Sequence, residues 1–328
     1  MNLVLPVRKR ENAIFIDFEY TSKLLQWDKF SSIRSRPRRL LEGDPHDYFY
    51  PIQKKAICAH YLVQQLGTDT IQFILLQSAY KFMQDIAFVE VELINNMATK
   101  IYNGSLRYVF PTAIRYDLLS IIIDEAYHAY VALDFIEQLQ QYTQIKQLDP
   151  SNEVELLQSI KNFIQLFPDD DSRDVFEIIA ICIGENTLTK ELFNLKHSTN
   201  INKIFQHVMS DHMLDEGRHS EIFSIILREL WRNLNANLKL KLAEILPEFI
   251  LDYLKPDLQI KFDMLLLSSV GLNGDDTQRV INATYPEYSA KTLKMKNPIF
   301  ENIIQVLTRA RLFEHQPTKT HFEMAGLL

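Results

Sequence analysis

Two segments of the chain carry the same Glu-x-x-His pattern, each inside a run of residues with helical periodicity. One holds Glu125 and His128, and the other holds Glu216 and His219. On a helix this spacing places both side chains on one face, and His212, four residues before Glu216, shares that face. Two inward-facing Glu-x-x-His units are half of the ligand set of a carboxylate-bridged two-metal site. The pattern therefore predicts a helical bundle around a buried metal centre.

The other half of such a site is one glutamate from each of two further helices. Glu185 ends a run of apolar residues in which a lone ionised carboxylate would be costly without a cation. Glu90 and Glu92 are both available in an earlier helical segment. They lie two residues apart, so only one of them can point at the metals, and the spacing leaves that choice open.

Glycine content favours helices throughout. The chain has eight glycines in 328 residues, together with 47% hydrophobic and 23% charged residues. So few glycines are typical of long helices, and they disfavour a β-sandwich or a dinucleotide-binding α/β fold. We therefore expect an all-α protein in which residues 1–328 form a single domain.

Periodicity and helix-ending residues divide the chain into an irregular N-terminal arm (1–48, with at most one short helix), a metal-binding bundle (68–234) and accessory C-terminal helices (235–328). The expected helices cover 51–66, 68–102, 111–141, 152–166, a segment around Glu185, 201–234, two stretches within 236–270, and 296–312. The tail from His315 is expected to be irregular.

Charge and hydropathy restrict the partners. The net charge is −7, and no basic stripe of the kind that follows a phosphate backbone is present, so nucleic acid is not expected. The basic cluster in the arm, at Arg34, Arg36, Arg38 and Arg39, is interpreted as solvated or salt-bridged. No run approaches the about 18 apolar residues that span a bilayer, so a cytoplasmic protein without a membrane is expected.

The proposed ligands also resemble those of a known family. The set Glu90, Glu125, His128, Glu185, His212, Glu216 and His219 resembles the ligands of the di-iron N-oxygenases typified by para-aminobenzoate N-oxygenase (the AurF-like family), including the additional histidine at His212. The resemblance covers about residues 68–234 and selects Glu90 over Glu92. It implies a ferritin-like four-helix bundle.

The resemblance also implies roles for these side chains. Glu125 and Glu216 would bridge or cap two irons, with manganese as an alternative metal. Glu90 and Glu185 would complete the carboxylates, and the three histidines would supply nitrogen. Related bundles further imply that Asp124 and Asp215 accept hydrogen bonds from the ring N–H of the opposite helix's histidine.

The implied reaction uses O2 as co-substrate to oxidise the nitrogen of a small-molecule amine to a hydroxylamine, and further to nitroso or nitro, in a secondary-metabolite pathway. Electrons would come from an external donor, because the sequence shows no flavin or nicotinamide fingerprint. A homodimer is left open. The alternatives are a di-iron hydroxylase or desaturase acting on carbon, and a ferritin-like iron-binding protein or ferroxidase. The additional His212 and the long single-chain core favour an enzyme over a ferroxidase.

Two positions depart from the family at the substrate. Where the arylamine enzymes hold the substrate carboxylate with a Tyr and an Asn, this chain has Phe82 and Glu191. A glutamate there would repel a carboxylate, so para-aminobenzoate is not the expected substrate. Glu191 would reach the cavity only through a local distortion of its helix, for instance near Gly184. The candidates for the family's C-terminal arginine are Arg309 and Arg311.

Overall fold

The computed structural model describes residues 12–44, 47–148, 153–196, 200–285 and 287–328, with 188–196 described by their backbone alone. Its first elements are β1 (Ile14–Phe15), α1 (Leu24–Phe30), α2 (Ser32–Ser35), η1 (Ile52–Lys54), η2 (Ala56–Ala59), α3 (Tyr61–Gln64), α4 (Thr68–Val89), η3 (Glu90–Asn95), α5 (Asn96–Tyr102), β2 (Tyr108–Val109), α6 (Thr112–Thr143) and α7 (Glu155–Ile164). They are followed by α8 (Asp170–Lys196), α9 (Lys203–Asn233), α10 (Ala236–Tyr253), α11 (Asp257–Ser269), α12 (Gly274–Thr284), α13 (Ala290–Lys296), α14 (Pro298–Arg309), η4 (Leu312–Glu314) and α15 (Gln316–Met324). The all-α prediction is confirmed.

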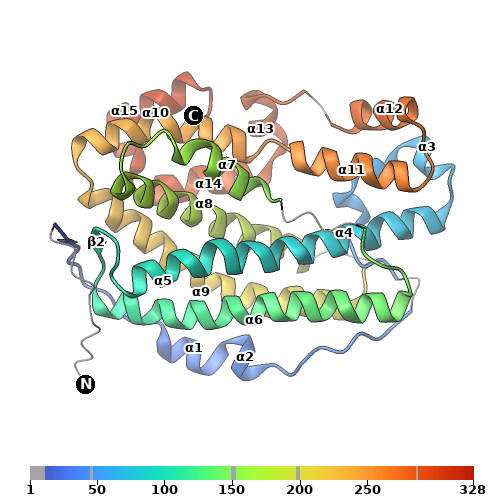
Figure 1. Ribbon diagram of the computed structural model, residues 1–328, viewed down its shortest axis with the longest axis horizontal. Coiled ribbons are helices and arrows are strands. Elements are labelled where there is room, and N and C mark those ends of the chain that lie inside the picture. Colours follow the sequence, from blue (N-terminus) through green and yellow to red (C-terminus); the bar gives the residue numbers. More distant parts are fainter. Residues whose placement is uncertain (1–11, 45–46, 149–152, 197–199, 286) are drawn as a thin grey trace.

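Four long helical units form the central bundle. The continuous unit α4–η3–α5 packs along α6, α8 packs along α9, and α6 also contacts α9 (Figure 1). The start of α9 is fixed by Asn202, whose side-chain oxygen accepts hydrogen bonds from the backbone N–H groups of Ile204 and Phe205. Helices of this length bring residues from the middle of each unit into one buried layer, which is the architecture of a four-helix bundle.

A π-helical turn interrupts the first unit at Glu90. The helix expected over 68–102 is present, but its residues 90–95 form the π-helical segment η3. Glu90 at its first position is fully buried, whereas Glu92 is exposed. The structure thus points Glu90 inward and Glu92 outward, as the two-residue spacing requires for one of them.

The N-terminal arm is more ordered than expected. Strand β1 pairs in parallel with β2, with Ile14 opposite Tyr108, and α1 and α2 lie against α6 and α9 (Figure 1). The salt-bridged interpretation of the basic cluster is confirmed, since Arg38 pairs with Asp134 at 2.7 Å and Arg39 with Asp211 at 2.7 Å.

The single helix expected over 51–66 is wrong. The chain instead forms two 3-10 turns, η1 and η2, and the short helix α3. The break falls at Lys55, whose backbone is non-helical (φ −119°, ψ 80°) and whose side chain is buried against Asp263. Spacings of three and four residues fit successive 3-10 turns as well as an α-helix, which explains the error.

The C-terminal helices cover the upper side of the bundle in Figure 1, with α10 packing on α7 and α14 on α8. The irregular tail expected from His315 is also wrong, because α15 forms there. Thr318 and Phe322, four residues apart, are buried, and the helix packs on α10. No helix in the described ranges is long and apolar enough to cross a membrane. The single-domain organisation stays a prediction.

Candidate metal centre

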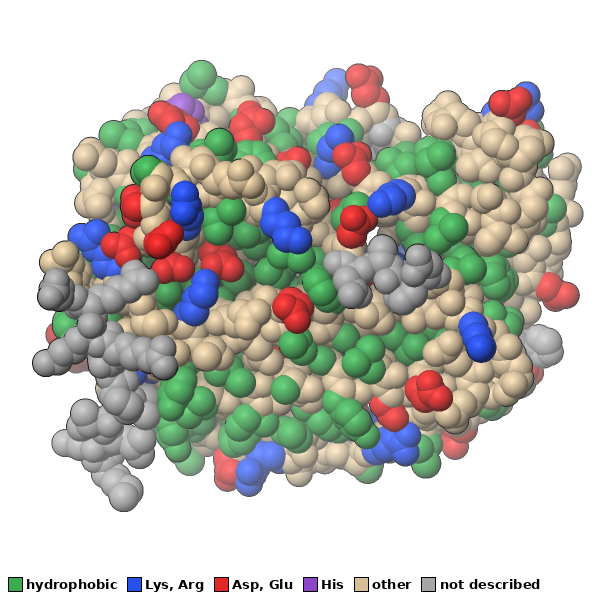
Figure 2. Space-filling model, viewed as in Figure 1, with side chains coloured by type: hydrophobic (Ala, Val, Ile, Leu, Met, Phe, Trp, Pro, Cys, Tyr) green, Lys and Arg blue, Asp and Glu red, His purple; other side chains and the backbone are tan. Residues whose placement is uncertain are grey.

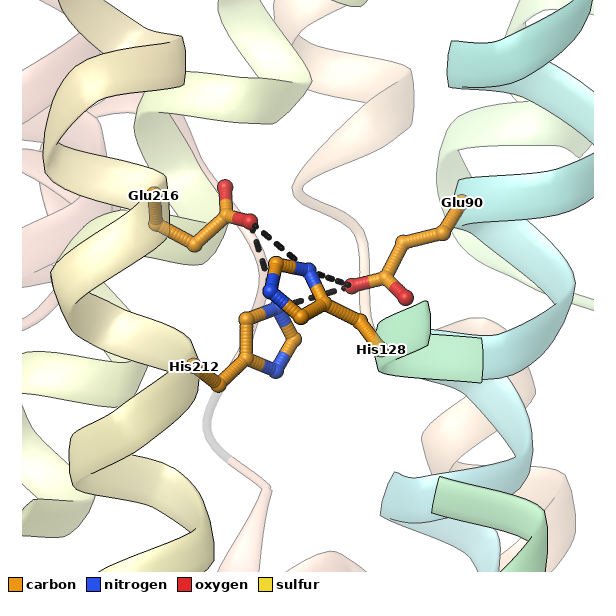
Figure 3. A group of neighbouring side chains, drawn as sticks. All are labelled: Glu90, His128, His212 and Glu216. Carbon is orange, nitrogen blue, oxygen red and sulfur yellow. Dashed lines mark ion pairs between the residues drawn. The ribbon is translucent and has the colours of Figure 1, made fainter. Parts of the chain in front are cut away.

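All seven residues proposed as ligands meet in the middle of the bundle, and each is buried. They form two groups that share Glu216: Glu90, His128, His212 and Glu216 in the first, and Glu125, Glu185, Glu216 and His219 in the second. Within each group the oxygen and nitrogen atoms able to bind a metal lie within 4.8 Å of one another. Figure 3 shows the side chains of the first group converging from separate helical units.

The first group closes around Glu90 and Glu216. His212 Nε2 lies 2.8 Å from Glu90 Oε1 and 3.2 Å from Glu216 Oε1. His128 Nδ1 is 3.4 Å from Glu216 Oε1 and 3.8 Å from Glu90 Oε1 (Figure 3). Two carboxylates and two imidazole nitrogens therefore surround one point between η3, α6 and α9.

The second group is built around His219. Its Nδ1 lies 2.9 Å from Glu125 Oε1, 3.2 Å from Glu216 Oε1 and 3.6 Å from Glu185 Oε1. Oε1 of Glu216 thus lies within 3.4 Å of a ring nitrogen of each of the three histidines. A carboxylate in that position is suited to bridging two metal ions.

Two aspartates fix the ring orientation of two of the histidines. Asp124 lies 3.1 Å from His219 Nε2, and Asp215 lies 3.1 Å from His128 Nε2. Since a carboxylate accepts, each Nε2 carries a proton, and each Nδ1 faces the glutamates, where it can bind a metal once its own proton is lost. Both histidines are therefore prepared to bind a metal through Nδ1.

Arg218 joins the two aspartates and was missed by sequence reasoning. Its terminal nitrogen donates to Asp124 at 2.5 Å and to Asp215 at 2.9 Å. Its position directly before His219, on a face that should be buried, is the signal that could have identified it. The single guanidinium offsets one of the two negative charges and donates to both carboxylates.

The arm completes the same network. Trp27 Nε1 donates to Asp124 at 2.9 Å, and the backbone N–H of Ser32 donates to Asp215 at 3.1 Å. Neither contact could be found from the sequence, because residues far from the bundle in the chain carry no ligand pattern. The arm is thus part of the framework around the centre.

Burial shifts the protonation of the metal-free site. Desolvation raises the pKa of Glu90 to about 7 and that of Glu185 well above its usual range. Burial also opposes ionisation of Glu216, but the neighbouring His219 and His212 outweigh it and hold the Glu216 pKa well below the usual value. For His219, charge attraction to Glu125 and Glu216 overcomes desolvation and raises the pKa well above 6.5.

The donor set fits a pair of divalent cations. Both carboxylate oxygens of Glu90, with His212 Nε2 and His219 Nδ1, are buried without an aligned hydrogen bond to any described residue. Such atoms are expensive unless something else satisfies them. Four carboxylates balance the charge of two divalent ions, and oxygen with imidazole donors suits iron or manganese.

Two pockets lie beside the centre. One is lined by the proposed ligands His128 and His212 and also by Arg36, Arg38 and Arg39. The other lies between α4, α7 and α8. It is lined by Phe82, by Val89 and Gly184, which precede Glu90 and Glu185 in the chain, and by Leu156. A Cβ on Gly184 would lie 2.4 Å from Leu156 Cδ2, so glycine allows α7 to pack closely beside Glu185.

The other residues considered for the substrate site are Glu191, Arg309 and Arg311. Helix α8 is regular through Gly184, so the local distortion that Glu191 would need to reach the cavity is not present there, and the side chain of Glu191 lies outside the described residues. Arg309 and Arg311 are both exposed and do not appear among the described residues that line either pocket.

Carboxylates and histidines that face one another inside a bundle of long helices define the ferritin-like class of metal proteins. Within that class, the family model described as P-aminobenzoate N-oxygenase AurF matches residues 27–323, and the chain belongs to this family. A relative, the 4-aminobenzoate N-oxygenase of Streptomyces thioluteus, is 23% identical over 170 residues, which cover 51% of this chain and 50% of the relative. The chain thus spans about half the length of that curated relative.

Proposed function

We propose that this protein is a non-haem di-iron oxygenase that oxidises the nitrogen of a small-molecule amine in a secondary-metabolite pathway. The observation that carries the proposal is the buried set of four carboxylates and three imidazoles arranged in two groups around Glu216. Family membership and the activity of the relative support the same reaction class. The overall balance is amine, O2, two electrons and two protons giving hydroxylamine and water.

The seven residues Glu90, Glu125, His128, Glu185, His212, Glu216 and His219 would hold the two ions. Two bound iron ions would supply electrons to dioxygen. Asp124 and Asp215 keep the His219 and His128 rings in the binding orientation. Val89 and Leu156 form an apolar part of the wall of the pocket between α4, α7 and α8, which would limit the water held there.

The pocket also favours a class of amine. Of the described residues that line it, Asp85 and Glu155 are acidic and none is basic. Phe82 carries no hydroxyl that could donate to a carboxylate. An amine with an apolar body and a neutral or cationic tail therefore fits the pocket between α4, α7 and α8 better than an aminobenzoate does. The pocket lined by His128 and His212 carries both arginines and aspartates, so its charge does not make the same selection.

The test is a screen of the iron-loaded, reduced protein against a library of amines under isotopically labelled O2, with mass detection. Products that gain labelled oxygen on nitrogen support the proposal. Oxygen on carbon, or loss of hydrogen, would indicate a hydroxylase or desaturase, and iron oxidation without organic product would indicate a ferroxidase. Glu216→Ala, which removes the shared carboxylate, is the matched inactive control.

Phe82 and Glu191 are tested by restoring the residues of the arylamine enzymes. The double variant Phe82→Tyr, Glu191→Asn should raise kcat/KM for an aminobenzoate, relative to an amine without a carboxylate, by about tenfold. The single variant Phe82→Tyr separates the contribution of the hydroxyl. An unchanged ratio in the double variant would remove both positions from the substrate site.

A further inference from the structure

A continuous chain of hydrogen bonds leads from the surface of the arm to the metal centre. Trp27 Nε1 donates to one oxygen of Asp124 at 2.9 Å, and the other oxygen accepts from His219 Nε2 at 3.1 Å. His219 Nδ1 in turn faces Glu125 at 2.9 Å. Trp27 is only half-buried, whereas Asp124 and His219 are fully buried. The indole is therefore the solvent-exposed end of a path that ends on a proposed ligand.

The proposed reaction requires a path by which electrons reach the metal centre. Both ferric ions must be reduced before dioxygen is consumed, and the chain has no fingerprint for a redox cofactor of its own. The ligands are buried, so a donor protein cannot touch the metals. We propose that Trp27 is the point of electron entry and that the face formed by α1 and α2 docks an acidic one-electron carrier protein. The inference rests on the di-iron part of the proposed function.

The surface around Trp27 has the composition of a docking site. Leu25, Phe30 and Ile33 are 86%, 55% and 39% exposed, an apolar group of the kind that marks protein contacts. Lys29 and Arg34 lie beside them, and Arg34 stands over the Trp27 ring at 5.3 Å. Along the lower edge of Figure 2, where α1 and α2 lie, hydrophobic side chains are accompanied by both basic and acidic ones.

The charge of the face formed by α1 and α2 indicates the charge of the partner that docks there. Six basic residues lie between Lys23 and Arg39, and the acidic side chains paired with five of them are Asp28, Asp134, Asp211 and Glu221. Among these residues a surplus of two positive charges remains, although the whole protein has a net charge of −7. A locally basic face on an acidic protein attracts an acidic carrier to this place and repels it elsewhere. Two successive one-electron transfers reduce two ferric ions to ferrous ions and oxidise two carrier molecules, while Trp27, Asp124 and His219 end unchanged.

The test measures reduction without substrate. Ferric, iron-loaded protein is mixed with a reduced plant-type [2Fe–2S] ferredoxin or with reduced methyl viologen, and loss of ferric absorbance is followed. Trp27→Phe keeps a ring in place but loses the hydrogen bond to Asp124. It should slow reduction by ferredoxin at least tenfold, leave reduction by the small viologen unchanged and keep the iron content. Trp231→Phe, in α9 against His315, is the matched control and should behave like the unaltered protein.

Docking is tested in the metal-free protein. Lys29→Glu should weaken ferredoxin binding at least fivefold by calorimetry at low salt, with the difference shrinking as salt is added. Lys241→Glu on α10 makes the same charge change elsewhere and should not weaken binding. Unaltered ferredoxin kinetics in Trp27→Phe, equal slowing with viologen, or unaltered binding in Lys29→Glu would each overturn the proposal. None of these measurements involves an amine, so a wrong substrate class leaves the result intact.

Discussion

Two of the buried groups of charged side chains in the described part of the protein are balanced in different ways. At the junction of η2 with α11, Lys55 and Asp263 are 4% and 1% exposed and form an ion pair. Asp263 also accepts hydrogen bonds from Gln259 at 2.8 Å and from Tyr285 at 2.7 Å. One lysine and two neutral donors thus neutralise and satisfy a single carboxylate.

In the metal centre the side chains do not fully neutralise and satisfy one another in this way. The ion pairs described among the seven side chains join four carboxylates to three histidines, and an imidazole is a cation only while it is protonated. Several of their buried atoms have no aligned hydrogen bond within the described ranges. The comparison indicates that the Lys55 pair is complete as folded, whereas the metal centre is completed by protons or by metal ions.

The largest expected effect comes from removing the carboxylate that both groups share. Glu216→Ala should abolish binding of both ions, from two per chain to nearly none by elemental analysis, because no other side chain among the described residues faces all three histidines. The exposed Glu92→Ala, two residues from Glu90, is the matched control and should keep two ions. One tightly held zinc per chain in the unaltered protein would contradict a two-metal centre.

Breaking the Lys55 pair should instead affect stability alone. Lys55→Met leaves the Asp263 charge buried without its cation, which costs about 3–5 kcal/mol of unfolding free energy. Chemical denaturation measures this loss, and metal content should stay at two ions per chain. Lys55→Met combined with Asp263→Leu should recover most of the loss. If Lys55→Met is as stable as the original protein, the buried pair contributes as little to the free energy of unfolding as a surface ion pair does.

The proposed ligands of the metal centre could be predicted from the sequence, whereas most of the residues that surround them could not. Glu125, His128, Glu216 and His219 could be found because a helix repeats its faces at three- and four-residue spacings, and Glu185 because an isolated carboxylate in an apolar run is costly. Those features are local. The choice of Glu90 over Glu92 came from a resemblance, and the π-helical turn that accompanies Glu90 has no signal in the sequence.

Contacts between segments that are far apart in the chain could not be predicted from the sequence. Trp27 and Ser32 reach Asp124 and Asp215 across the fold, and nothing in an arm without periodicity predicts where it will lie. The same limit explains α15, whose burial depends on α10. The broken helix near Lys55 was mispredicted because the partner that draws its side chain inward, Asp263, is far along the chain.

A change of pH should alter the affinity of the metal centre for its ions. In the metal-free centre burial raises the pKa of Glu90 to about 7, so near neutral pH this carboxyl is partly protonated and metal binding must release a proton. Metal affinity should therefore rise with pH, by up to about tenfold per unit for each proton released. Because the pKa values of Glu185 and His219 are also raised, the rise should continue above pH 7. Titration calorimetry in buffers of different ionisation enthalpy counts the protons. An affinity that stays constant from pH 6 to 8 would contradict this protonation.

The smallest effect on metal binding should come from His212. Its Nε2 faces Glu90 at 2.8 Å and Glu216 at 3.2 Å, so it can contribute a nitrogen ligand. It differs from His128 and His219, however, because no aspartate among the described residues holds its second ring nitrogen. His212→Ala should therefore leave most of the metal bound, with a loss of affinity below about tenfold, whereas Asp215→Asn, which frees His128, should cost about 10–100-fold. The two variants are compared by competition with a chelator and by oxygen consumption of the reduced protein, whose time course should change in His212→Ala. Unchanged oxygen kinetics in that variant would mean that His212 serves only the packing against His128, whose ring centroid lies 3.9 Å away.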